Sequence, residues 1–116
     1  MKNLIGVVAF MCLSSIAQAK GVAYTATVLD VRIDYTGHGF IKFKDPLKDA
    51  YGSTIPECTQ EAYSNMLAFN VNTQGGKAVM AIALAAKASG KLVHGVGRGK
   101  CDIYGVMEDW EYGWVQ

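Results

Sequence analysis

The final segment of the chain, residues 104–114, combines aromatic rings with carboxylates at alternating positions. On a strand, one face of this segment carries six side chains: Tyr104, Val106, Glu108, Trp110, Tyr112 and Trp114. Aromatic rings stack on the apolar C–H patches of sugars, and carboxylates accept hydrogen bonds from sugar hydroxyls. The pattern predicts a carbohydrate-binding strand with Tyr104, Trp110 and Tyr112 as ligand candidates. The alternative is that these rings pack in the core or in a subunit interface, because a core also needs one apolar face.

The same residues do not predict an enzyme. His38 and His94 are the two histidines of the chain, and no short motif links either to a nucleophile. Glu108, Asp109 and Glu111 offer paired carboxylates of the kind used in glycoside hydrolysis. On one strand, however, Glu108 faces away from Asp109 and Glu111. We therefore expect no catalytic residue, no metal site and no cofactor.

Alternating apolar residues and turn signals divide the chain into five strands and one helix. The strands are predicted at residues 22–35, 40–44, 66–71, 92–96 and 101–114. A helix at 76–89 follows the third strand, with Asn72 or Thr73 as its N-cap and Gly90 as its C-cap. Alternating glycines at positions 95, 97 and 99 indicate a bulged or sharply bent strand and a close backbone approach.

Three strands, one helix and two strands is the order of the five-stranded Greek-key barrel called the OB-fold. The predicted fold class is therefore all-β with one helix, and the alternative is another small α+β sheet with a helix on its face. The turn between the first two strands is a place where OB-folds commonly bind ligands. It adds Tyr35, Thr36 and His38 to the ligand candidates, unless this is an ordinary solvated turn.

The predicted helix is apolar almost all the way round, whereas a surface helix of one small domain needs only an apolar stripe. One face has a barrel to plug, and the second face has no obvious partner within one small core. This pattern predicts a homo-oligomer. The candidate interface residues are Val79, Met80, Ile82, Ala83, Leu84 and Lys87.

The first nineteen residues have the organisation of a secretory signal peptide. Lys2 supplies the positive start, residues 4–16 are apolar, and Ala17-Gln18-Ala19 forms a small-x-small cleavage site. The apolar run is too short for a membrane anchor, and no second run follows. We expect a mature domain at residues 20–116 in the periplasm or outside the cell.

Charge and cysteine content limit the function of this domain. The 116-residue chain has eleven basic and ten acidic residues, and Lys2 is the one charged residue of the signal peptide. A neutral mature domain argues against a nucleic-acid binder, which needs a basic surface. Cys58 and Cys101 remain after processing and most simply form one disulfide in an oxidising compartment. The disulfide would stabilise the fold by about 4 kcal/mol.

Three features together resemble the B subunits of bacterial AB5 toxins, most closely the subtilase-cytotoxin type. They are Cys58 before the third strand, the helix at 76–89, and the sequence Ala-Ser-Gly-Lys-Leu-Val at 88–93. The resemblance implies an OB-fold pentamer whose helices line the centre of a ring and whose outer face binds glycans. It assigns no glycan-site residue here, and it leaves a toxic A subunit unknown as a partner.

The leading hypothesis is thus a secreted or periplasmic, non-catalytic module that binds carbohydrate as a homo-oligomer. The alternative is a structural or inhibitory envelope protein that binds another protein and no glycan.

Overall fold

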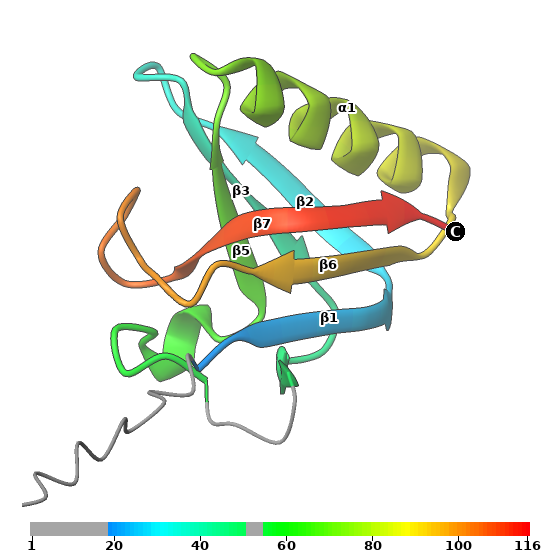
Figure 1. The fold of residues 1–116 in the computed structure, drawn as a ribbon. Coiled ribbons are helices and arrows are strands. Elements are labelled where there is room, and N and C mark those ends of the chain that lie inside the picture. Colours follow the sequence, from blue (N-terminus) through cyan, green and yellow to red (C-terminus); the bar gives the residue numbers. More distant parts are fainter. Residues whose placement is uncertain (1–18, 51–54) are drawn as a thin grey trace, which may run out of the picture.

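The computed structural model describes residues 19–50 and 55–116. Figure 1 shows one sheet with a single α-helix lying over it. The predicted signal peptide falls almost entirely outside the described residues. The helical and strand elements are β1 Gly21–Ala26, β2 Val28–Ile33, β3 His38–Phe43, β4 Lys48–Asp49, the 3₁₀ turn η2 Glu61–Tyr63, β5 Met66–Asn70, α1 Gln74–Ser89, β6 Val93–Gly97 and β7 Glu108–Val115.

The strands form one seven-stranded sheet in the order β2-β3-β5-β7-β6-β1-β4. Among the strands of the described residues, β5 and β7 form the only parallel pair, and the other neighbouring strands are antiparallel. The sheet does not close into a barrel. The prediction of a mostly β fold with a single helix is therefore confirmed. Five predicted strands become seven because the first one divides and a two-residue strand, β4, forms between the second and third predicted strands.

The first predicted strand divides at a bulge near Thr25. Thr25 has a φ of 37°, and the pairing of β1 with β6 shifts register between Ala23 and Ala26. A bulge increases the local twist of a strand and turns it. As a result β1 pairs with β6 while β2, the continuation of the same chain, pairs with β3. One segment thus reaches both halves of the sheet.

The helix has the caps that its sequence predicts. Thr73 Oγ1 accepts a hydrogen bond from Gly76 N at 2.9 Å, and Gly90 adopts the left-handed conformation with a φ of 68°. Gly76 lies so close to the end of β5 that a Cβ there would be 1.6 Å from the carbonyl oxygen of Asn70. This contact fixes the first turn of α1 against the sheet, so the helix starts two residues earlier than predicted.

The core lies between α1 and the sheet. The helix packs against β2, β5 and β7, and it buries Val79, Ala83 and Ala86. The largest fully buried apolar side chains opposite are Phe43, Ile41, Leu67 and Val93. Burial of each such side chain stabilises the fold by about 1.5–3 kcal/mol.

Candidate functional site

The C-terminal strand is shorter than predicted. β7 begins at Glu108, and residues 101–107 form a turn-rich loop in which Gly105 N donates to the carbonyl of Cys101 at 2.9 Å. Gly105 has a φ of 79°, a value that favours glycine and breaks an extended strand. The predicted start at Cys101 is therefore wrong, and Tyr104 belongs to the loop.

A second irregularity separates the aromatic rings of β7 between two faces. Gly97 of β6 pairs with Trp110, but Val96, one residue earlier, pairs with Tyr112, so Glu111 is an extra residue in β7. Trp110 is consequently buried in the core, on the same face as Gly113. Tyr112 and Trp114 are about half exposed. Strict alternation, which placed all three rings on one face, fails at this bulge.

Glycines make room for the Trp110 indole. A Cβ at Gly95 would lie 2.5 Å from the indole ring, and one at Gly113 would lie 2.6 Å from it. These distances are shorter than real Cβ contacts, so both positions require glycine for the ring to lie flat on the sheet. Of the predicted ligand residues, Trp110 is therefore the one that the structure places in the core, with 9% of its surface exposed.

The outer face of β1, β6 and β7 carries a cluster of exposed rings. His94 stacks on Trp114 with ring centroids 4.3 Å apart and an interplanar angle of 12°. Tyr24 of β1 contacts His94 of β6 edge-on, with ring centroids 5.0 Å apart. Tyr24 and Trp114 are half exposed, as is Tyr112 two residues before Trp114. We call Tyr24, His94, Tyr112 and Trp114 the aromatic platform.

Sequence reasoning found only Tyr112 of this platform. The pairing of Ala23 with Gly95 and of His94 with Trp114 brings the other rings together, and the first of these pairings joins strands that are about seventy residues apart in sequence. The one signal that the sequence offered for the platform was an aromatic ring in each of the three strands.

A second group of side chains surrounds Tyr104 at the outer side of β2 and β3. The Tyr104 hydroxyl donates a hydrogen bond to Asp34, and Arg32 Nε donates to the same carboxylate at 2.8 Å. The Tyr104 and Phe40 rings lie edge to face at 6.1 Å. Burial and the Asp34 hydrogen bond raise the pKa of Tyr104 to about 12. The same hydrogen bond, followed by Arg32, lowers the pKa of Asp34 below its usual 3.8.

The predicted turn residues contribute unequally to this group. His38 lies against the Tyr104 ring, with centroids 6.0 Å apart. Thr36 is held through its carbonyl, which accepts a hydrogen bond from Asn72 Nδ2 at 2.8 Å. Tyr35 is fully exposed. The structure therefore brings His38 and Tyr104 together, sets Thr36 in the turn beside them, and places Tyr112 on a different surface.

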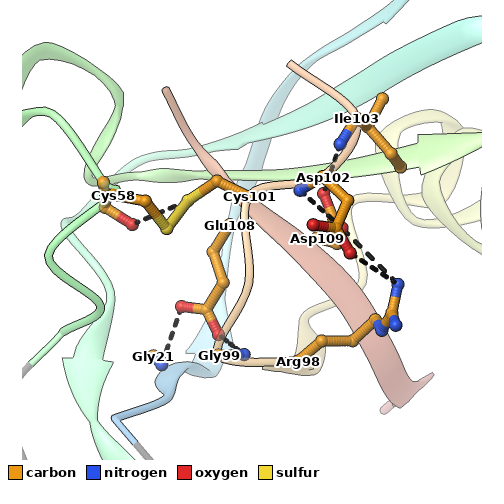
Figure 2. Close-up of a disulfide and its surroundings, with 10 residues drawn as sticks. Gly21, Cys58, Arg98, Gly99, Cys101, Asp102, Ile103, Glu108 and Asp109 are labelled. Atoms are coloured by element: carbon orange, nitrogen blue, oxygen red, sulfur yellow. Dashed lines mark hydrogen bonds and ion pairs between the residues drawn. A yellow bond between two sulfur atoms is a disulfide. The ribbon is translucent and has the colours of Figure 1, made fainter. Parts of the chain in front are cut away.

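Two adjacent acids at the start of β7 are buried and serve as anchors (Figure 2). Glu108 accepts hydrogen bonds from the backbone of Gly21 at 2.9 Å and of Gly99 at 2.8 Å. Asp109 accepts from Asp102 N at 3.1 Å and Ile103 N at 3.2 Å. Burial raises the pKa of both carboxyls, and the amide hydrogen bonds oppose that rise. These oxygens hold the loop after β6 in place.

The close backbone approach predicted for the glycines is confirmed at Glu108. A Cβ at Gly97 would lie 1.8 Å from Glu108 Oε2, and Gly99 has a φ of 77° while its amide donates to the same carboxylate. One cysteine of the predicted disulfide, Cys101, also lies in this loop. Cys58 and Cys101 are bonded with Cα atoms 6.0 Å apart, which ties the loop to the segment before β5 (Figure 2).

The predicted interface residues of α1 lie on different sides of the helix. Val79 and Ala83 are buried in the core of their own chain, and Met80 and Ile82 are partly buried against it. Leu84 is 50% exposed, and Lys87 is exposed with it. The exposed side of the helix also carries Lys77 and the small residues Ala78, Ala81, Ala85 and Ala88.

A cleft of about 490 Å³ lies beside the first turns of α1. Its walls come from β5, α1, β7 and the loop after β6. Among the described residues, no group of three or more histidine, cysteine or acidic side chains is placed to hold a metal ion. Within the same residues, no helix has the length and apolar character needed to cross a membrane.

Comparisons with protein-family models, curated proteins and solved structures found no match. The resemblance to toxin B subunits therefore remains a prediction, and the arguments about function depend on the geometry described above.

Proposed function

We propose that this protein is an exported, non-catalytic module that binds carbohydrate as a homo-oligomer, with the aromatic platform as its binding surface. The observation that carries the proposal is the gathering of exposed rings from three strands on one outer face. Soluble proteins seldom expose contiguous apolar surface without a binding role. Rings that also carry polar groups suit a ligand that combines C–H patches with hydroxyls.

The surroundings of the platform support a sugar ligand over an apolar one. Lys20 directly precedes β1, and its Nζ lies 2.9 Å from Oε2 of Glu111, the bulged residue of β7. This ion pair is partly exposed and joins the residue before β1 to β7. It offers charged donors and acceptors to the hydroxyls of a sugar that stacks on Trp114.

The strand order supports a fold of the OB type. With β1 and β2 counted as one bent strand, the first three strands are neighbours, the last two complete the ladder, and the third pairs in parallel with the fifth. The helix lies between the third and fourth strands in sequence, and in space it packs against the third and fifth strands. We infer that the protein is an open variant of that barrel, resembling toxin B subunits in design.

The exposed side of α1 supports the homo-oligomer. Leu84 is half exposed among alanines, and such a surface permits close packing of a second helix. Light scattering on the protein from Lys20 onward tests this part. A mass of several subunits at micromolar concentration is expected, with Leu84→Lys reducing it. A monomer would contradict this part of the proposal.

A glycan array tests the ligand. The unmodified protein is expected to bind a defined set of glycans, and Trp114→Ala and Tyr24→Ala are expected to reduce that binding at least tenfold. Tyr35→Ala is the matched control, because it removes a fully exposed ring from the turn between β2 and β3, outside the three platform strands.

Two outcomes would contradict the carbohydrate proposal. One is an array without any bound glycan. The other is a stoichiometric protein partner from periplasmic extract whose capture is lost with Trp114→Ala, which would favour the envelope-protein alternative.

A further inference from the structure

The cleft beside α1 lies on the other side of β7 from the Trp114 ring. Trp110 and Gly113 line it from the core side, and it shares one lining residue, Tyr112, with the aromatic platform. Its apolar wall includes Phe69 and Ile82. At about 490 Å³ the cleft is of a size that accepts a small organic molecule.

Arg98 supplies the cationic group of this cleft. Its Nη1 lies 3.5 Å from Asp109 Oδ2 and 4.0 Å from Asp102 Oδ2, both longer than a normal hydrogen bond. Two backbone amides fix Asp109, and Asp109 in turn holds the Arg98 guanidinium at the cleft (Figure 2). At these distances the N–H donors of the guanidinium are not fully used. A guanidinium has five N–H donors in a planar fork that matches a carboxylate.

The acids near the cleft already have partners that limit their repulsion of an anion. Asp109 is buried and accepts two amide hydrogen bonds, and Glu111 pairs with Lys20 Nζ at 2.9 Å. Asp102 is 66% exposed and touches Arg98 only at 4.0 Å. A ligand carboxylate can therefore displace Asp102 into solvent and take its place on the guanidinium.

We propose that this cleft binds a small carboxylate with an apolar or aromatic body. The carboxylate pairs with the Arg98 guanidinium, and the body lies against Trp110 and Ile82. The proposal does not depend on carbohydrate binding at the platform, and it assigns a second class of ligand to the opposite face of β7.

The test compares 3-phenylpropionate with 3-phenylpropan-1-ol, which has the same ring and chain without the charge. Titration followed by amide chemical shifts is expected to show the carboxylate binding with a Kd of about 1 mM. The alcohol is expected to bind at least tenfold more weakly. Shifts should be confined to the cleft, including Gly75 and Ile103.

Gly75→Leu is the variant that separates binding from folding. Gly75 lines the cleft, and an added Cβ there meets no atom within 4 Å, so a side chain can start at this position without a clash and is expected to narrow the cleft. It should abolish binding with the fold retained. Ala88→Leu, on the exposed last turn of the same helix, is the control and should bind normally.

Arg98→Gln is expected to weaken 3-phenylpropionate binding at least tenfold and to leave the alcohol unchanged. The proposal is overturned if neither probe binds, if carboxylate and alcohol bind alike, or if Gly75→Leu binds as the unmodified protein does. Loss of binding at the platform in a glycan array has no bearing on these results.

Discussion

Trp110 and Trp114 belong to the same short strand but have opposite environments. Trp110 is 9% exposed and lies on two glycines in the core, whereas Trp114 is 47% exposed and stacks on His94 outside it. One bulged residue, Glu111, produces the difference, because it shifts every later side chain of β7 to the other face. The comparison shows that an aromatic strand can supply both a core and a binding surface.

The largest expected effect is a difference in stability between the two tryptophans. Trp110→Ala removes a buried ring and should lower the free energy of unfolding by about 3–5 kcal/mol. Trp114→Ala removes one stacked pair at the surface and should lower it by about 1 kcal/mol or less. Urea denaturation of the disulfide-bonded protein measures both. Equal losses would show that the two faces of β7 are not distinct.

A smaller effect is expected from the glycines that support Trp110. Gly113→Ala places a Cβ within 2.6 Å of the indole and should destabilise the protein by about 1–3 kcal/mol. Gly75→Ala is the matched substitution in open space, and it should be neutral or stabilising by up to about 1 kcal/mol. If Gly113→Ala proved neutral, the indole would not be fixed by this close contact.

Local signals were sufficient to predict much of the fold. Thr73 and Gly90 were identified as possible helix caps because capping depends on neighbouring residues, and the structure confirms both. The Cys58–Cys101 disulfide followed from counting the cysteines left after the predicted cleavage. The order of strands and helix followed from alternation and turn residues.

The candidate site depended on contacts that local patterns do not encode. The bulge at Glu111 arises from pairing with β6, so alternation along β7 alone misplaced Trp110. Tyr24 and His94 meet only through the register of β1 with β6. Tyr104 is in a loop whose shape is set by buried hydrogen bonds to Asp109, which a sequence pattern does not reveal.

The smallest expected effect is a pH trend at the start of β7, where the two faces diverge. Burial raises the pKa of Glu108 above its usual 4.5 in the folded protein. A raised pKa means that its contribution to stability is complete below pH 4.5 and decreases as pH rises through the folded value. Glu108→Gln removes this titration and should cost about 1 kcal/mol, because its amide nitrogen faces one of the two backbone donors.

The expected result is therefore a gap between the two proteins that is widest near pH 4 and narrows toward pH 7. Denaturation curves at several pH values measure the gap. Glu111→Gln makes the same substitution at the partly exposed bulge and is the control. A gap that widened with pH would mean that the charged form of Glu108 is the stabilising one, with its two amide hydrogen bonds outweighing burial.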